Sequence, residues 1–143
     1  MWAKPGSRSG LRIRGQRGHP VVRRALVRYA KWLRANYEFP VRVPVYLLPG
    51  PTLTTVHGEE CSASFFAPVR PTDEPFIRVA TGDFAALQRI RGRDNALASF
   101  ITSLSHEVIH YQQWLRSGST SERGVSAAAS GMLRRYERST ARP

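Results

Sequence analysis

The feature that most limits the possible folds of this chain is one amphipathic segment. Asp94 is a suitable N-cap for a helix, and Gly118 is a suitable residue for its C-terminal end. Between them, apolar side chains recur at the three- and four-residue spacing of one helical face: Leu97, Phe100, Ile101, Leu104, Val108 and Leu115. The segment therefore predicts one long helix, from about 94 to 116, that buries one face against the rest of the protein.

The remainder of the chain predicts a single α+β domain around this helix. With 143 residues, of which 41% are apolar, the chain is long enough for one hydrophobic core. A helical pattern over 21–37 comes first, and short strand patterns follow at 41–49, 61–68 and 76–82. A short helix over 83–91 precedes the long one, and a last helix starts at Ser119. A helix, a small sheet of three to four strands and then further helices are typical of an α+β fold.

The charge of the chain is strongly positive and concentrated towards its ends. The formal net charge is +12, and no acidic residue precedes Glu38. We expect residues 1–19 to be a disordered, arginine-rich arm, residues 20–139 to be the folded domain, and residues 140–143 to be a flexible tail. The charge of the arm indicates either binding to nucleic acid or only a solvated tail.

Several features bear on where the protein acts. No apolar run approaches the roughly 20 residues of a membrane span, and the N-terminal residues lack the apolar core of a signal peptide. Cys61 is the only cysteine, so the chain cannot form an internal disulfide. We therefore expect a cytoplasmic protein without a membrane partner.

Two histidines on the long helix indicate a metal site. His106 and His110 are four residues apart, so their imidazoles project from one face of a helix and can bind one ion. Imidazole suits zinc, and zinc lowers the pKa of a bound water to roughly 7. Glu107 lies about 100° around the helix from His106, where it can reach such a water without being a ligand. This H-E-x-x-H pattern needs a third ligand from elsewhere; the alternative is an ordinary helix with two surface histidines.

The stretch LSHEVIHYQQWL, residues 104–115, resembles the active-site helix of zincin metallopeptidases. The order of the predicted elements is similar to that of the minimal gluzincins, in which a glutamate on the next helix is the third zinc ligand. The resemblance implies a zincin-like fold and a zinc metalloendopeptidase, a hydrolase in which Glu107 is the general base. It also implies that an extended peptide substrate pairs with an edge strand, for which residues 61–68 are the candidate.

Two downstream carboxylates compete for the position of the third ligand. On the last predicted helix, Glu122 shares the inward stripe with Ala129. It can instead form a capping box with Ser119. Glu137 lies further along that helix among arginines, where a surface ion pair is the simpler role. The resemblance favours Glu122, and the other candidates are His57, Glu59, Glu60 and Cys61.

The remaining predictions concern the role of Tyr136 and an alternative function. Tyr136 on the last predicted helix can donate a hydrogen bond to the oxyanion of a tetrahedral intermediate, and a packing role fits its position equally well. The alternative function is that of a basic, nucleic-acid-associated protein with the zincin fold as a zinc-binding scaffold, or of a protease that DNA recruits. The expected partners are thus a peptide or protein substrate and, through the arm, nucleic acid.

Overall fold

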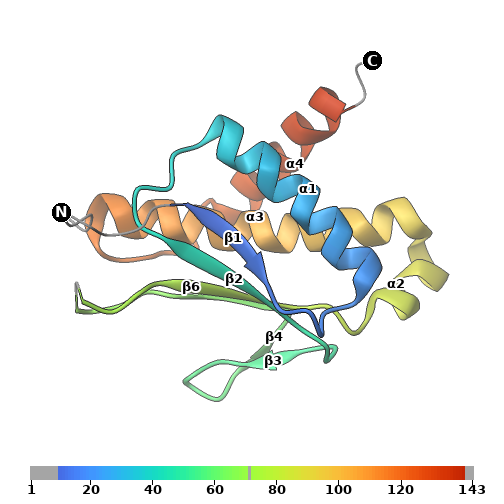
Figure 1. Ribbon diagram of the computed structural model, residues 1–143, viewed down its shortest axis with the longest axis horizontal. Coiled ribbons are helices and arrows are strands. Elements are labelled where there is room, and N and C mark those ends of the chain that lie inside the picture. Colours follow the sequence, from blue (N-terminus) through green and yellow to red (C-terminus); the bar gives the residue numbers. More distant parts are fainter. Residues whose placement is uncertain (1–9, 71, 141–143) are drawn as a thin grey trace.

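The computed structural model describes residues 10–70 and 72–140, which form four helices and six short strands. Figure 1 shows their arrangement. In chain order they are β1 (Leu11–Arg14), α1 (Pro20–Asn36), β2 (Val43–Leu48), β3 (Leu53–Thr54), β4 (Glu60–Cys61), β5 (Ala63–Phe66), β6 (Phe76–Ala80), α2 (Phe84–Arg91), α3 (Arg93–Ser117) and α4 (Val125–Thr140). In this part of the chain no helix is both long enough and apolar enough to cross a membrane.

Four strands form one mixed sheet in the order β1-β2-β6-β5. The strands β1, β2 and β6 are parallel, with Leu11 paired to Val43 and Val45 paired to Ile77. The strand β5 runs antiparallel to β6, with Phe65 paired to Ile77. The strands β3 and β4 form a separate two-stranded sheet. Within the described residues, β5 therefore has one edge that no strand pairs with.

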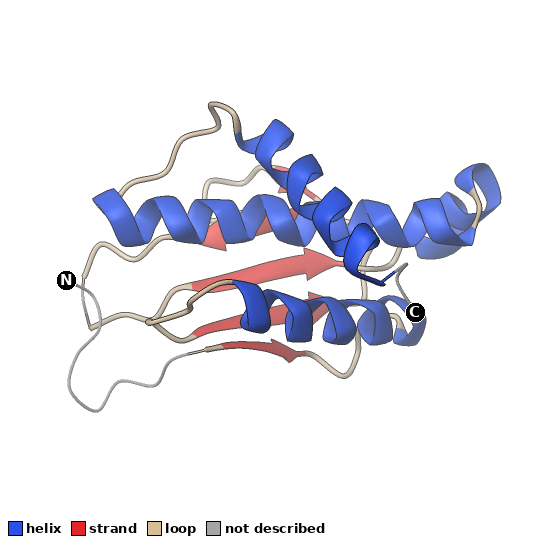
Figure 2. Ribbon diagram, turned by 90° about the horizontal axis from the view of Figure 1, so that it is seen from above, coloured by secondary structure: helices blue, strands red, loops and turns tan. Residues whose placement is uncertain are grey.

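Helices α1 and α3 cover one face of the four-stranded sheet (Figure 1, Figure 2). Alternate side chains of the two central strands are buried in the common core: Val43, Val45, Leu47, Ile77 and Val79. Helix α4 packs on α3 on the side away from the sheet, and its C-terminal half reaches α1 (Figure 2). Helix α3 thus lies between the sheet and α4, which holds it in place from both sides.

The α+β class is confirmed, but one prediction about the start of the chain is wrong. Residues 1–19 are not a disordered arm throughout, because Leu11–Arg14 is β1, an edge strand of the sheet. Leu11 is fully buried, and Arg34 of α1 donates a hydrogen bond to its carbonyl oxygen at 2.9 Å. The alternation in this segment spans only four residues. Pairing with β2, and not the local pattern, therefore makes it a strand.

The folded part of the chain is longer at both ends than the predicted domain of residues 20–139. The strand β1 and the turn after it add residues 10–19. Thr140, assigned to the tail from the sequence, is the last residue of α4. Residues 1–9 and 141–143, the remainder of the predicted arm and tail, lie outside the described residues.

The last helix begins later than the sequence predicts. It starts at Val125 and not at Ser119. Gly118, with a φ value of 76°, is the left-handed residue that ends α3, and Gly124, with a φ value of 74°, directly precedes α4. The residues between these two glycines therefore form a loop, and Glu122 lies in it.

Candidate metal centre

The long helix predicted from the sequence is confirmed as α3, and it places its two histidines one turn apart. The ring centroids of His106 and His110 are separated by 4.9 Å. The side chain of His106 is 27% exposed and that of His110 only 7%. On the opposite faces of the same turns, Leu104, Val108 and Tyr111 are fully buried in the core. The buried side of α3 thus fixes the orientation of both imidazoles.

Glu122 completes a group of three ligand-type side chains. Its Oε1 lies 2.9 Å from Nε2 of His106, and its Oε2 lies 2.8 Å from Nε2 of His110. One ligand atom from each residue lies within 4.8 Å of the others. Burial raises the pKa of Glu122, but the hydrogen bonds and charges of the two histidines outweigh it and lower the pKa below its ordinary value. We call His106, His110 and Glu122 the metal group.

The donor atoms of the metal group fit a metal ion. Two imidazole nitrogens and one carboxylate oxygen suit zinc and related transition metals. Sites with three protein ligands leave a coordination position open. The side chain of Glu122 is 76% exposed, so solvent reaches the group from the loop side. The group could therefore hold a metal ion that is accessible from outside.

Glu122 reaches the histidines from a loop and not, as predicted, from the first turn of a helix. The structure also lacks the capping box with Ser119 that the sequence allowed. The hydroxyl of Ser121 accepts a hydrogen bond from the backbone N–H of Arg123 at 3.2 Å. The backbone N–H of Ser119 donates instead to the hydroxyl of Ser117 at 3.4 Å. Glu122, the residue expected as the third ligand, is thus at the site, but a loop and not a helical turn positions it.

Gln113 connects the parts of the metal group, and the sequence analysis missed it. Its Oε1 lies 3.0 Å from Nδ1 of His110 and accepts a hydrogen bond from the backbone N–H of Ser121 at 3.0 Å. Its Nε2 donates to the carbonyl oxygen of Ser121 at 3.0 Å. When Nδ1 of His110 donates to Gln113, Nε2 is left free for a metal, and the same amide fixes the loop next to Glu122. The available signal was its position three residues after His110, on the same helical face.

Replacing Gln113 with alanine should weaken zinc binding about 10- to 100-fold, the usual cost of losing a partner that orients a metal ligand. The variant loses both the hydrogen bond to His110 and the anchor of the loop. The matched control is Gln112→Ala, because the neighbouring glutamine makes none of these hydrogen bonds. A competition titration against a chromogenic zinc chelator measures both affinities. Equal affinities of the two variants would contradict the role of Gln113.

Glu107 lies beside the metal group without belonging to it. The residue is only 7% exposed. It lines a cavity of about 260 Å³ between α3 and the start of β5, together with Ser62, Ala63, Thr102, Ser103 and His106. Burial and, to a smaller extent, the charge of Glu122 raise the pKa of Glu107 to about 8. A cation in the metal group would favour the ionised carboxylate and oppose this shift.

Tyr136 is not brought to the metal group. Its ring packs edge-on against Tyr29 and Trp32 of α1, with centroid separations of 4.8 and 5.5 Å. Burial raises the pKa of its phenol. No contact joins Tyr136 to the metal group within the described part of the chain. Of the two roles that the sequence allowed, the structure supports packing between α4 and α1 and gives no support to the oxyanion role.

The remaining candidate ligands lie outside the metal group: His57, Glu59, Glu60, Cys61 and Glu137. His57 is exposed in the turn between β3 and β4. Glu60 accepts a hydrogen bond from the hydroxyl of Thr52 at 2.8 Å. Burial and, to a smaller extent, the charge of Glu107 raise the pKa of the Cys61 thiol. Among the described residues, only the metal group unites three potential ligands.

Fold and site together define an α+β domain with a candidate metal centre. Its two histidines lie on the longest helix, α3, and its glutamate lies in the loop that follows α3. No protein-family model matches the chain, and comparisons with curated proteins and with solved structures find no similar chain. The donor set, its accessible position and the buried carboxylate beside it are the features from which a function can be inferred.

Proposed function

We propose that this protein is a zinc-dependent metallopeptidase of the gluzincin type, an endopeptidase that hydrolyses peptide bonds. The observation that carries the proposal is the position of Glu107. This buried carboxylate lies on the helix that supplies two of the ligands, lines a cavity with one of them, and is not itself part of the metal group. A structural zinc site uses four protein ligands, whereas three ligands and an adjacent free carboxylate suit hydrolysis.

The side chains divide the chemistry between them. Zinc held by the metal group would supply a Lewis acid that polarises the peptide carbonyl and makes water a better nucleophile. Glu107 would accept the proton of the attacking water and deliver it to the nitrogen of the leaving amine. The charge of the zinc ion would favour the ionised form of Glu107, which is the form that can take up a proton and release it in one cycle. Gln113 would orient His110 throughout.

The substrate is proposed to lie along β5. This strand is at the edge of the sheet, and its first residue, Ala63, and Ser62 before it line the cavity of Glu107. An extended peptide that adds to the free edge of β5 gains backbone hydrogen bonds without needing deep side-chain pockets. Its carbonyl groups would pass the cavity that Glu107 and His106 line.

The zincin-like character of the fold is part of the same proposal. Helix α3 carries the H-E-x-x-H pattern, follows the sheet in the chain and packs beside β5. The segment after α3 supplies the glutamate of the metal group. This arrangement supports the expectation drawn from the minimal gluzincins, with the difference that the glutamate precedes the last helix.

Removal and return of zinc test the proposed function. Protein stripped with a chelator should lose cleavage of unfolded casein, and stoichiometric zinc should restore it, because the Lewis acid and the nucleophile both depend on the metal. Cleavage products are followed by electrophoresis and mass spectrometry, with untreated protein as the control. Cleavage that persists without metal, or zinc-loaded protein that cleaves neither casein nor a diverse peptide library, would refute the proposal.

A further inference from the structure

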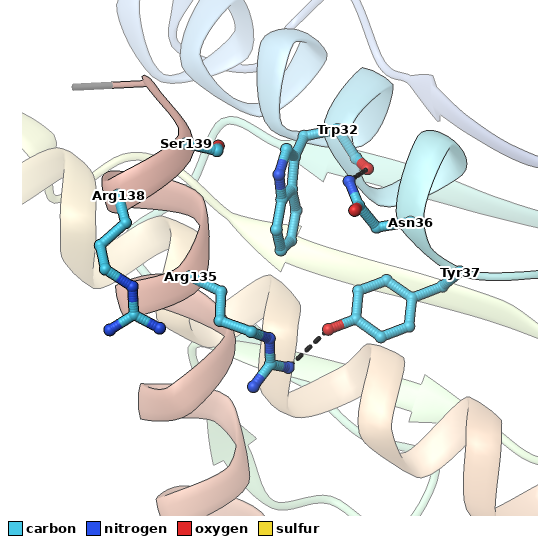
Figure 3. Close-up of a pocket in the computed structure, with 6 residues that line it drawn as sticks. All are labelled: Trp32, Asn36, Tyr37, Arg135, Arg138 and Ser139. Atoms are coloured by element: carbon cyan, nitrogen blue, oxygen red, sulfur yellow. Dashed lines mark hydrogen bonds between the residues drawn. The ribbon is translucent and has the colours of Figure 1, made fainter. Parts of the chain in front are cut away.

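A second cavity lies apart from the metal centre, between the C-terminal ends of α1 and α4. Its volume is about 610 Å³, within the range of pockets that bind small molecules. Figure 3 shows the residues that line it: Trp32, Asn36, Tyr37, Arg135, Arg138 and Ser139. None of them belongs to the metal group or to the cavity of Glu107. Whatever this cavity binds is therefore independent of the proposed peptidase chemistry.

The aromatic part of the cavity is firmly held. The ring of Trp32 is stacked on Tyr29 at a centroid distance of 5.7 Å and makes edge contacts with Tyr37 at 5.9 Å and Tyr136 at 5.5 Å. In Figure 3 the indole stands between α1 and α4 and contributes to the wall of the cavity. Trp32 remains only partly buried. A rigid, accessible indole is a good surface for a planar ligand, since little side-chain entropy is lost on binding.

The polar part of the cavity is cationic, and no carboxylate lines it among the residues that the structure describes. Arg135 donates a hydrogen bond to the hydroxyl of Tyr37 at 2.5 Å, which orients the guanidinium (Figure 3). No carboxylate of the described residues forms an ion pair with Arg135. Among the described residues Arg138 has no ion-pair partner. The acidic residues nearest in sequence are Glu38 and Glu137, and neither lines the cavity.

The two helices around the cavity extend this positive charge. Helix α1 has five cationic side chains and no acidic one: Arg23, Arg24, Arg28, Lys31 and Arg34. Helix α4 adds Arg134 to the two arginines of the cavity. Such a field attracts anions and concentrates them near the cavity. The ligand chemistry that matches both walls is a phosphate joined to a planar ring.

We propose that this cavity binds a nucleotide unit, with its phosphate at the arginine side of the cavity, formed by Arg135 and Arg138, and its base against Trp32. Guanidinium groups pair with phosphate oxygens through charge-assisted hydrogen bonds, and stacking on an aromatic side chain does not depend on base identity. The unit is supplied either by a free nucleotide or by single-stranded nucleic acid. The site lies on the folded domain and does not require the N-terminal arm.

Binding of a fluorescein-labelled oligothymidine to the full chain, followed by anisotropy at low salt, tests this proposal. Arg138→Glu should weaken binding about tenfold or more. Arg93→Glu, which makes the same charge change at an exposed residue outside the cavity, should change it little. Trp32→Ala should weaken binding about 5- to 100-fold through lost stacking. Because Trp32 also packs against three tyrosines, a melting curve is measured for Trp32→Ala. If Trp32→Ala unfolds, Arg138→Glu still tests the proposal.

Competition identifies the source of the nucleotide unit. Displacement of the probe by adenosine monophosphate at comparable concentration indicates a free nucleotide. Resistance to the mononucleotide, with displacement by unlabelled single strand, indicates nucleic acid. Equal weakening by Arg138→Glu and Arg93→Glu would show binding through overall charge and would overturn the proposal. Absence of binding to all of these probes at low salt would overturn it as well, and neither outcome would affect the metal centre.

Discussion

Glu107→Gln should leave zinc content unchanged and lower the rate of peptide cleavage by about 10²- to 10⁴-fold, the range that a positioned general base contributes. Glutamine has nearly the same size and shape but cannot accept a proton from water. Because Glu107 is buried beside the metal group and is not part of it, the change removes no ligand. A neutral amide also avoids the cost of burying a charge, so the variant should fold normally.

The experiment combines metal analysis, a melting curve and the rate of casein cleavage on the same preparation. The matched control is Glu38→Gln, the same substitution at an exposed residue outside the site. Loss of cleavage together with loss of zinc would show instead that Glu107 acts as a ligand. Equal cleavage rates in the wild type, the control and Glu107→Gln would refute its role as the base.

Glu122→Ala should weaken zinc binding by at least about a hundredfold, because it removes one of three ligands. This loss exceeds that expected for a residue that only orients a ligand through a hydrogen bond. The melting temperature of the metal-free protein should change little. The side chain is 76% exposed, and α4 does not depend on it for a capping box. The matched control is Glu137→Ala, the same substitution at an exposed glutamate of α4 outside the metal group.

A zinc competition titration on both variants decides between the two glutamates. The double variant His106→Ala/His110→Ala sets the lower limit and should retain less than about a tenth of the metal, since it lacks both imidazole ligands. Full zinc content in this double variant would refute the metal group as a whole. Unchanged affinity in Glu122→Ala would contradict its assignment as a ligand and return the question to Glu137 or to the residues of the β3–β4 region.

The sequence predicted the central helix well because the relevant forces are local. Apolar spacing and a terminal glycine determine where α3 lies, and a separation of four residues places His106 and His110 on one face in any regular helix. Glu107 lies beside them for the same reason. The pattern H-E-x-x-H therefore contained the geometry of these three side chains before any tertiary contact was known.

The start of the chain shows where such reasoning fails. Leu11–Arg14 is flanked by glycines and arginines and resembles a solvated arm when it is considered alone. It becomes a strand because Leu11 is buried against α1 and β2 supplies its hydrogen-bond partners. Four residues are too few to carry a periodic signal that stands out from the background.

The sequence by itself determined the long helix, the pair of histidines on one face of it and the α+β order of elements, because each follows from the spacing of residues close together in the chain. Only the tertiary structure decided the rest. The two left-handed glycines turn the loop so that Glu122 faces the histidines, and Gln113 ties that loop to His110. Packing against α1 directs Tyr136 into an aromatic cluster. These outcomes depend on contacts between segments that are distant in sequence. Local sequence patterns do not predict the free energies of such contacts.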